Sequence, residues 1–520
     1  MRMARAWLIP FLLVLVFVGL RVARITADPP THYPTGQAAR ELIVEGPAKA
    51  HEARRFGLFG TFATKPVDNY SIWRAQSPAY VLPLAGFFHV FGVSHVSLRI
   101  FAALAAGLGL VACFALGKQS QNPLVAPIAC LLVAVSFFDI QLTRSGLIEP
   151  VLNGVLALAI LAGILALRSL PWMLLCQIAF ALALLTKQTA LVAFPVLLAV
   201  GIAAHLQARK RGVPGWQHLA SIGLGLLLGT LLLLYILSPR YWQTVEWNFG
   251  HMIVGVGKNH ELSLDAVQFS PLWTRLTDLQ RWKNIVLYIA PLAPLALIQL
   301  GRSAISALRR RPFDPLDLIA GGWLLCALVA LQLTGHERPR FSIILLPPAA
   351  LLIASFLASL TRLQVRPLLR FAPLILAGLV VVGTDLRWLW QWASAPRYEI
   401  HEAARTIREA LDEEAVVVGS WASPLGFDST ADLFYVKPPF NSSKKAISEL
   451  GVTHLLLRSR GDSVGSRVAR FFPKSYETKV KLARVRIQRD HYVLYRLEEP
   501  LRPDVKARRR PASLRGRGAP

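Results

Sequence analysis

Long uninterrupted apolar segments occupy most of the chain from Trp7 to Trp392, and polar residues fall mainly between them. Each segment is about 20 residues long, which matches the hydrocarbon thickness of a bilayer. A soluble core of this size would instead alternate apolar and polar positions at helical or strand spacing. The pattern predicts a polytopic α-helical membrane protein of about eleven spans. These are 7–24, 95–117, 123–139, 150–168, 172–188, 190–206, 217–238, 284–301, 316–334, 341–360 and 371–391.

Three segments depart from this pattern. Residues 78–93 are apolar but too short to span once Pro83 is counted, so they are predicted to form an interfacial or re-entrant helix. Residues 393–500 alternate helix and strand signals, which predicts a small C-terminal extracytoplasmic α/β domain. Residues 501–520 are rich in Arg and Pro and are predicted to be a disordered basic tail.

Basic residues occupy alternate loops between the predicted spans. Because short cytoplasmic loops carry an excess of Lys and Arg, this places the N-terminus inside and, after an odd number of spans, the C-terminus outside. Residues 1–392 then form a transmembrane domain with two long outer loops, 25–94 and 239–283. Met1–Leu20 resembles a signal sequence without a cleavage site, and is predicted to be an uncleaved anchor.

Composition agrees with a membrane protein. Charged residues make up 17% of the 520 residues and the mean hydropathy is +0.45, whereas soluble domains carry roughly a quarter charged residues. The net charge of +27 is explained by the basic loops, so no nucleic-acid partner is expected. All four cysteines lie inside apolar segments, which excludes external disulfides and a cysteine metal site.

Several charged residues on the predicted outer side are not explained by topology. Asp28 follows the first span, Arg144 and Glu149 flank the start of the fourth, and Lys187 lies between two spans. Charges this close to hydrocarbon are costly unless they are paired or used, so their common side indicates a site. Each also has an alternative, structural interpretation. In it Asp28 ends a helix, Glu149 is a favourable acid at a helix N-terminus, and Lys187 and Arg144 extend to lipid phosphates. The corresponding interpretation of the turn His336–Arg340 is a salt-bridged cap between two spans.

Several short motifs follow one another in a fixed order along the chain. They are Asp28 after the first span, Trp73–Pro78, Phe88–Val93, Ser97–Arg99, Arg144 with Glu149–Pro150, Leu184–Lys187, and Arg338–Phe341 running into Leu345–Pro347. This order resembles the GT-C glycosyltransferases of the protein-mannosyltransferase and aminoarabinose-transferase type (glycosyltransferase family 39 and relatives). The resemblance covers roughly residues 7–360. It departs from the family where Pro29 replaces a second acid after Asp28, and where Glu149 replaces an Asp.

The resemblance implies an enzyme that moves a sugar from a polyprenyl-phosphate carrier to a hydroxyl acceptor by an inverting displacement. The acceptor is a lipid, a glycan or a protein, and the location implied is a bacterial inner membrane with a periplasmic or extracellular active face. Membrane lipids are the other expected partners, and neither a metal nor a cofactor is expected. In this scheme Asp28 and Glu149 are catalytic carboxylates, with Asp28 taking the acceptor proton. Donor phosphate would be bound by Lys187, His336, Arg338 and Arg340, with Arg144, Glu337 and Tyr70 in supporting positions.

Two other function classes remain as alternatives. A transporter or flippase would show inverted repeats and polar groups near the bilayer midplane, and neither is evident. A non-catalytic envelope assembly protein would not need these charged residues to converge on one cavity. The aromatic residues of the outer loop 239–283 fit either sugar stacking or an interfacial belt.

Overall fold

The structure is a computed structural model that describes residues 2–29, 46–47, 50, 77–237, 292–333, 339–361, 367–434, 444–459, 462–487 and 490–501. The chain forms two compact units, which divide between Pro396 and Arg397. The first unit is helical and the second combines helices with a sheet. The predicted outer loop 239–283 and the tail 502–520 lie outside the described residues.

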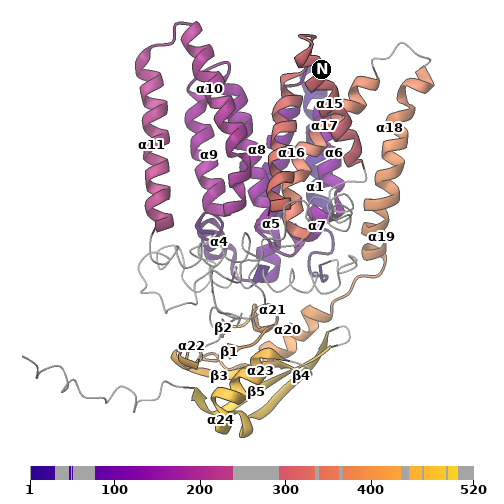
Figure 1. Ribbon diagram of the computed structural model, residues 1–520. Coiled ribbons are helices and arrows are strands. Elements are labelled where there is room, and N and C mark those ends of the chain that lie inside the picture. Colours follow the sequence, from indigo (N-terminus) through magenta and orange to yellow (C-terminus); the bar gives the residue numbers. More distant parts are fainter. Residues whose placement is uncertain are drawn as a thin grey trace, which may run out of the picture. The chain divides into compact units, whose positions relative to one another are not determined.

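The first unit is a bundle of apolar helices (Figure 1). Its α-helices are α1 (Arg2–Val22), α4 (Pro78–Phe91), α5 (His95–Gly117), α6 (Val125–Val135), α7 (Phe137–Arg144), α8 (Glu149–Ala166), α9 (Trp172–Thr186), α10 (Phe194–Lys210), α11 (Gly215–Leu237), α15 (Ala293–Leu308), α16 (Pro315–Leu333), α17 (Leu346–Leu360), α18 (Pro367–Val381) and α19 (Arg387–Ser394). Two 3-10 helices, η1 (Gln188–Ala193) and η3 (Pro339–Leu345), continue into α10 and α17, and a π-helical turn η4 (Val382–Leu386) joins α18 to α19.

Seven helical segments in the described part of the chain are long and apolar enough to cross a membrane. An eighth span results if α6 and α7 count together, and α1, α9 and α15 provide shorter apolar stretches. In the part of the chain that the structure describes, each predicted span overlaps a helical segment, which confirms the polytopic helical architecture. The first half of the predicted span 284–301 lies outside that part. The predicted span 123–139 is not continuous, because the structure breaks it at Ser136 with a bend of 54°. The Ser136 hydroxyl accepts from the backbone N–H of Asp139 and starts a new helix there.

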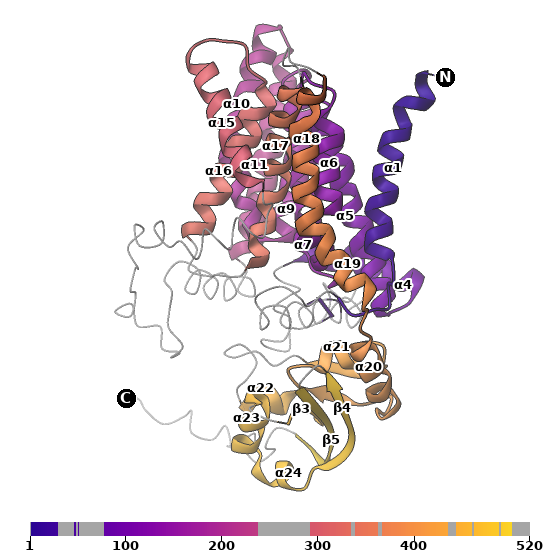
Figure 2. The same cartoon turned by 90° about the vertical axis from the view of Figure 1, so that its right-hand side faces the viewer.

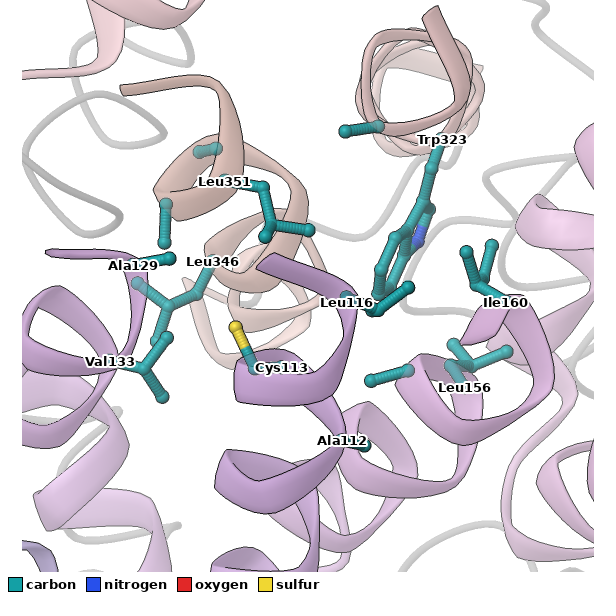
Figure 3. Packing of buried hydrophobic residues seen from close by; sticks show 14 of the residues in the cluster. Ala112, Cys113, Leu116, Ala129, Val133, Leu156, Ile160, Trp323, Leu346 and Leu351 are labelled. Carbon is teal, nitrogen blue, oxygen red and sulfur yellow. The ribbon is translucent and has the colours of Figure 1, made fainter. Parts of the chain in front are cut away.

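Small residues allow the central helices to pack closely. A side chain at Gly109 in α5 would meet the Cα atom of Gly154 in α8 at 2.7 Å, so both positions need glycine. In the hydrophobic core of the same helices, Leu116 and Ile160 lie beside Trp323 of α16 (Figure 3). The cysteines are free thiols, with Cys113 inside this core, as expected from the sequence.

Hydrogen bonds gather the predicted inner loops at one end of the bundle. The Asn122 amide donates to the carbonyl oxygen of Ala358 at 2.8 Å, and Arg211 donates to the carbonyl oxygen of Arg168. The N-terminus of α1, at the edge of the bundle in Figure 2, lies at this end, whereas the 14-residue helix α4 lies at the other. The basic loops among the described residues thus lie at one end of the bundle.

The second unit contains a five-stranded sheet in the order β2-β1-β3-β5-β4. Strand β1 (Val416–Val418) pairs in parallel with β2 (Asp432–Phe434) and β3 (Val452–Arg458), while β5 (Asp490–Leu501) is antiparallel to β3 and to β4 (Val480–Ile487). The prediction of a small α/β fold is therefore confirmed. Its helices are α20 (Glu399–Glu409), α21 (Ala422–Gly426), α22 (Lys444–Glu449), α23 (Ser463–Phe471) and α24 (Pro473–Glu477).

Candidate functional site

Asp28 lies on a tight turn that begins where α1 ends. The backbone N–H of Ala27 donates to the Arg24 carbonyl at 2.8 Å, and Arg24 itself has a left-handed backbone with φ of 49°. The turn leads to Asp28, which is only 7% exposed, and the Trp392 indole donates to the Asp28 carbonyl oxygen at 3.0 Å. A carboxylate next to the first span is thus held inside the unit instead of facing solvent.

Arg144 fixes this turn from the C-terminus of α7. Its guanidinium, in a side chain that is 1% exposed, donates to the carbonyl oxygens of Arg21 at 2.9 Å, Ala23 at 2.7 Å and Arg24 at 2.7 Å. Of these, the Arg21 carbonyl lies in the last turn of α1, where a helix leaves carbonyls without an internal partner. The guanidinium also lies 4.2 Å from the centre of the Trp392 ring. Arg144 therefore binds backbone, and the alternative that it extends to lipid phosphate is wrong.

Arg99 holds the same turn from α5. It donates to the carbonyl oxygens of Ile25 and Ala27, the latter at 2.7 Å, and is 7% exposed. The sequence placed Arg99 in a family-like motif but gave it no role. The available signal was a charged residue inside an otherwise apolar helix, which is costly unless it has a partner.

A second buried contact at this end joins α1 to α7 and was not predicted. Arg21 forms an ion pair with Asp139, and both side chains are almost fully buried. Arg21 also donates to the carbonyl oxygens of Phe17 and Ala134, each at 3.1 Å. The break at Ser136 makes this possible, because it places Asp139 in the first turn of a new helix, where a carboxylate is favoured.

Glu149 and Lys187 form the second ion pair at this end, with Nζ to Oε1 at 2.6 Å. Glu149 is in the first turn of α8, and Lys187 is an extended residue between α9 and η1. The side chains are 2% and 16% exposed, so the carboxylate is the more deeply buried partner. Lys187 is therefore paired with a carboxylate inside the first unit.

The short connection between α7 and α8 links the Asp28 turn to the Glu149–Lys187 ion pair. It begins at Arg144, which holds the Asp28 turn, and ends at Glu149, which pairs with Lys187. Its Gly146 has φ of 67°, and a Cβ atom there would meet the Leu98 side chain at 2.6 Å. The Tyr80 hydroxyl donates to the Gly146 carbonyl at 2.7 Å, which attaches α4 to the same connection. The backbone geometry requires glycine at this position.

The remaining predicted residues are described only in part. Tyr70, His336, Glu337 and Arg338 lie outside the described residues, as does the side chain of Arg340. The backbone of Arg340 belongs to η3, and Asn153 of α8 donates to the Ile343 carbonyl in η3 at 2.8 Å.

Asn153 lies four residues after Glu149, so both side chains occupy one face of α8. The element that carries Arg340 therefore packs on the helix that carries Glu149. Within the residues that the structure describes, no three His, Cys, Asp or Glu side chains are grouped so as to hold a metal ion.

Comparison with known proteins gives the class of this fold. The sequence model of the family described as dolichyl-phosphate-mannose-protein mannosyltransferase matches residues 75–242, the stretch that contains Arg99, Arg144, Glu149 and Lys187. No curated protein matches the sequence. Among solved structures, the chain is similar to ArnT from Cupriavidus metallidurans bound to undecaprenyl phosphate. The TM-score is 0.61 and the identity 13%, covering 94% of this chain and 98% of that chain.

The chain is also similar to the archaeal oligosaccharyltransferase AglB from Archaeoglobus fulgidus, in complex with an inhibitory peptide and a dolichol-phosphate. The TM-score is 0.52 and the identity 12%, covering 86% of this chain and 68% of that chain. The chain is thus an integral membrane protein with the GT-C fold of these glycosyltransferases. The GT-C fold that the resemblance implied is therefore confirmed.

Proposed function

We propose that the chain is a glycosyltransferase that moves a sugar from a polyprenyl-phosphate carrier to a hydroxyl acceptor. The reaction takes place at the end of the bundle that carries Asp28, Glu149 and Lys187. The observation that carries the proposal is that Asp28, Glu149 and two arginines are buried, and Lys187 is half-buried, at one end of a GT-C fold. Such an arrangement is expensive in an apolar bundle unless the charges are paired or used. Two similar structures contain undecaprenyl phosphate and dolichol-phosphate, which supports this donor class.

Asp28 is the proposed general base. The acceptor oxygen forms a bond to C1 of the sugar while the bond from C1 to the phosphate oxygen breaks, and the hydroxyl proton passes to the Asp28 carboxylate. One such displacement inverts the configuration at C1. Arg99 and Arg144 are the proposed positioning residues for this step, because they fix the backbone of the turn that carries Asp28. A rigid turn keeps a general base within hydrogen-bond reach of the proton that it removes.

Lys187 is the proposed cation for the departing phosphate. Glu149 holds its Nζ at 2.6 Å, so the ammonium occupies one position before the donor binds. A cation that is already in place stabilises developing negative charge without reorganisation during the reaction. Arg338, Arg340 and His336 remain proposed phosphate ligands, and Glu337 and Tyr70 remain proposed supporting residues. The proposed active face is periplasmic or extracellular, and the acceptor is a lipid, a glycan or a protein.

A transfer assay with purified full-length chain tests the proposal. Polyprenyl-phosphate sugars would be supplied with hydroxyl acceptors of the three classes, and release of polyprenyl phosphate would be followed. The Asp28→Asn variant keeps the shape of the side chain but loses the base, so turnover should fall by about a hundredfold or more. Donor affinity should change little because it depends on the cations. The exposed Glu413→Gln serves as the matched carboxylate control and should keep full turnover.

The outcomes separate the candidate functions. Turnover in the Asp28→Asn variant close to that of the parent chain would remove this residue from the mechanism and leave Glu149 as the next base. Transport of a lipid-linked glycan across proteoliposomes without sugar transfer would instead favour a flippase and refute the proposed function.

A further inference from the structure

An apolar cavity lies between α9, α10 and α11, on residues that the proposed reaction does not use. Its volume is about 1120 Å³. The cavity extends along α10 from Phe194 to Arg209, which corresponds to about 22 Å at 1.5 Å per residue. This is most of the roughly 30 Å hydrocarbon thickness of a bilayer. Its dimensions and lining suit a long hydrocarbon chain.

One end of the cavity is rich in hydrogen-bond donors. The cavity is lined there by Arg209, His205 and His218. Lys210 and Arg211 follow directly in the sequence. Nδ1 of His205 lies 2.8 Å from Nδ1 of His218, and Nε2 of His205 lies 3.4 Å from the Ser221 hydroxyl. These contacts use both nitrogens of His205 and only one of His218. No Asp or Glu is among the cavity-lining residues. The polar end therefore matches a negatively charged group.

We propose that this cavity binds an anionic phospholipid. The phosphate lies at Arg209 and Nε2 of His218, and an acyl chain follows α10 and α11 toward Phe194. A guanidinium and an imidazole N–H both donate strong hydrogen bonds to phosphate oxygens. Arg211, two residues after Arg209, donates to Arg168 at the end of the bundle opposite to Lys187. The site is thus separate from the proposed donor phosphate site.

The headgroup is tested with a pair of arginine variants in the full-length chain. Purified protein in nanodiscs of mixed phosphatidylglycerol and phosphatidylcholine would be analysed by native mass spectrometry for retained lipid. The parent chain should retain phosphatidylglycerol. Arg209→Gln should reduce this retention about tenfold. Arg309→Gln removes the same charge at the end of α15, away from the cavity, and should have no effect.

The acyl-chain part is tested with two glycines of α11. Gly229 lines the cavity and Gly223 does not, and a Cβ atom at either position meets nothing within 4 Å. Gly229→Phe should displace the lipid, whereas Gly223→Phe should retain it. Equal retention of both phospholipids by the parent chain would overturn the proposal. Loss of phosphatidylglycerol from Gly229→Phe without loss from Arg209→Gln would also overturn it. The cavity would then bind a hydrocarbon chain without recognising the charge of the headgroup.

Discussion

Breaking the Glu149–Lys187 pair should distinguish a structural ion pair from a phosphate site. Lys187→Met leaves the Glu149 carboxylate, whose side chain is 2% exposed, without its ammonium partner. Removing one partner of a buried pair costs about 3–5 kcal/mol, because the other charge remains buried without compensation. The single variant should therefore lower the midpoint of thermal unfolding by several degrees, measured by tryptophan fluorescence in detergent.

The double variant Lys187→Met with Glu149→Leu should recover most of that stability. Two apolar side chains of similar volume can replace a buried ion pair at nearly no cost, or even with a gain. The double variant therefore allows the effect on turnover to be measured without a loss of stability. If Lys187 stabilises the departing phosphate, the stable double variant should still lose about a hundredfold or more in sugar transfer, the usual scale for one electrostatic donor.

Two results would refute this reasoning. Full stability of Lys187→Met would mean that the carboxylate finds another partner, and that the pair contributes little to the fold. Sugar transfer at the parent rate by the double variant would mean that the pair is structural only. Binding of the donor, measured separately, should weaken in both variants because the ammonium is absent from both.

Three further predictions concern other parts of the chain. Arg144→Lys keeps the charge but not the planar set of donors, so turnover should fall at least tenfold with unchanged KM for the donor, whereas exposed Arg168→Lys should be neutral. Burial lowers the pKa of His454 below its ordinary value of 6.5, so the second unit should be fully stable above this pH and lose stability as the pH falls below it. Hydrogen exchange of β3 should be faster at about pH 5.5 than at about pH 7.5 after correction for intrinsic rates, and His454→Gln should remove the difference. A reporter active only outside the cytoplasm should be active after Arg397 and silent after Arg211, and the reverse would refute the predicted topology.

The helical architecture could be predicted because the bilayer imposes it. An apolar chain in hydrocarbon must satisfy its backbone hydrogen bonds internally, so about 20 apolar residues correspond to one helix. Length and hydropathy then determine where α5, α8 and α16 lie. Averaging hydropathy over a span conceals the break at Ser136, because one hydroxyl and one carboxylate barely change the mean hydropathy of 123–139. The hydrogen bond from the backbone N–H of Asp139 to the Ser136 hydroxyl caps a new helix. This local signal is not visible in a hydropathy average taken over the whole span.

The candidate site could be predicted only as a set of charges on one side. Sidedness follows from the alternation of spans, so Asp28, Glu149 and Lys187 were expected at the same end. Their partners depend on packing between helices that are far apart in sequence. Arg21 and Asp139 are separated by 118 residues, and the sequence offered no reason to pair them.

The arginines that hold the Asp28 turn show why such contacts are hard to predict. Arg99 and Arg144 bind backbone carbonyls, and every residue of the turn offers one whatever its side chain. A carboxylate partner leaves a complementary residue in the sequence, but a carbonyl partner leaves none. For Arg99 the informative signal is the reverse: a buried arginine in an apolar helix without a carboxylate nearby in the sequence. Where a span ends beside it, the free carbonyls of that end are its natural acceptors.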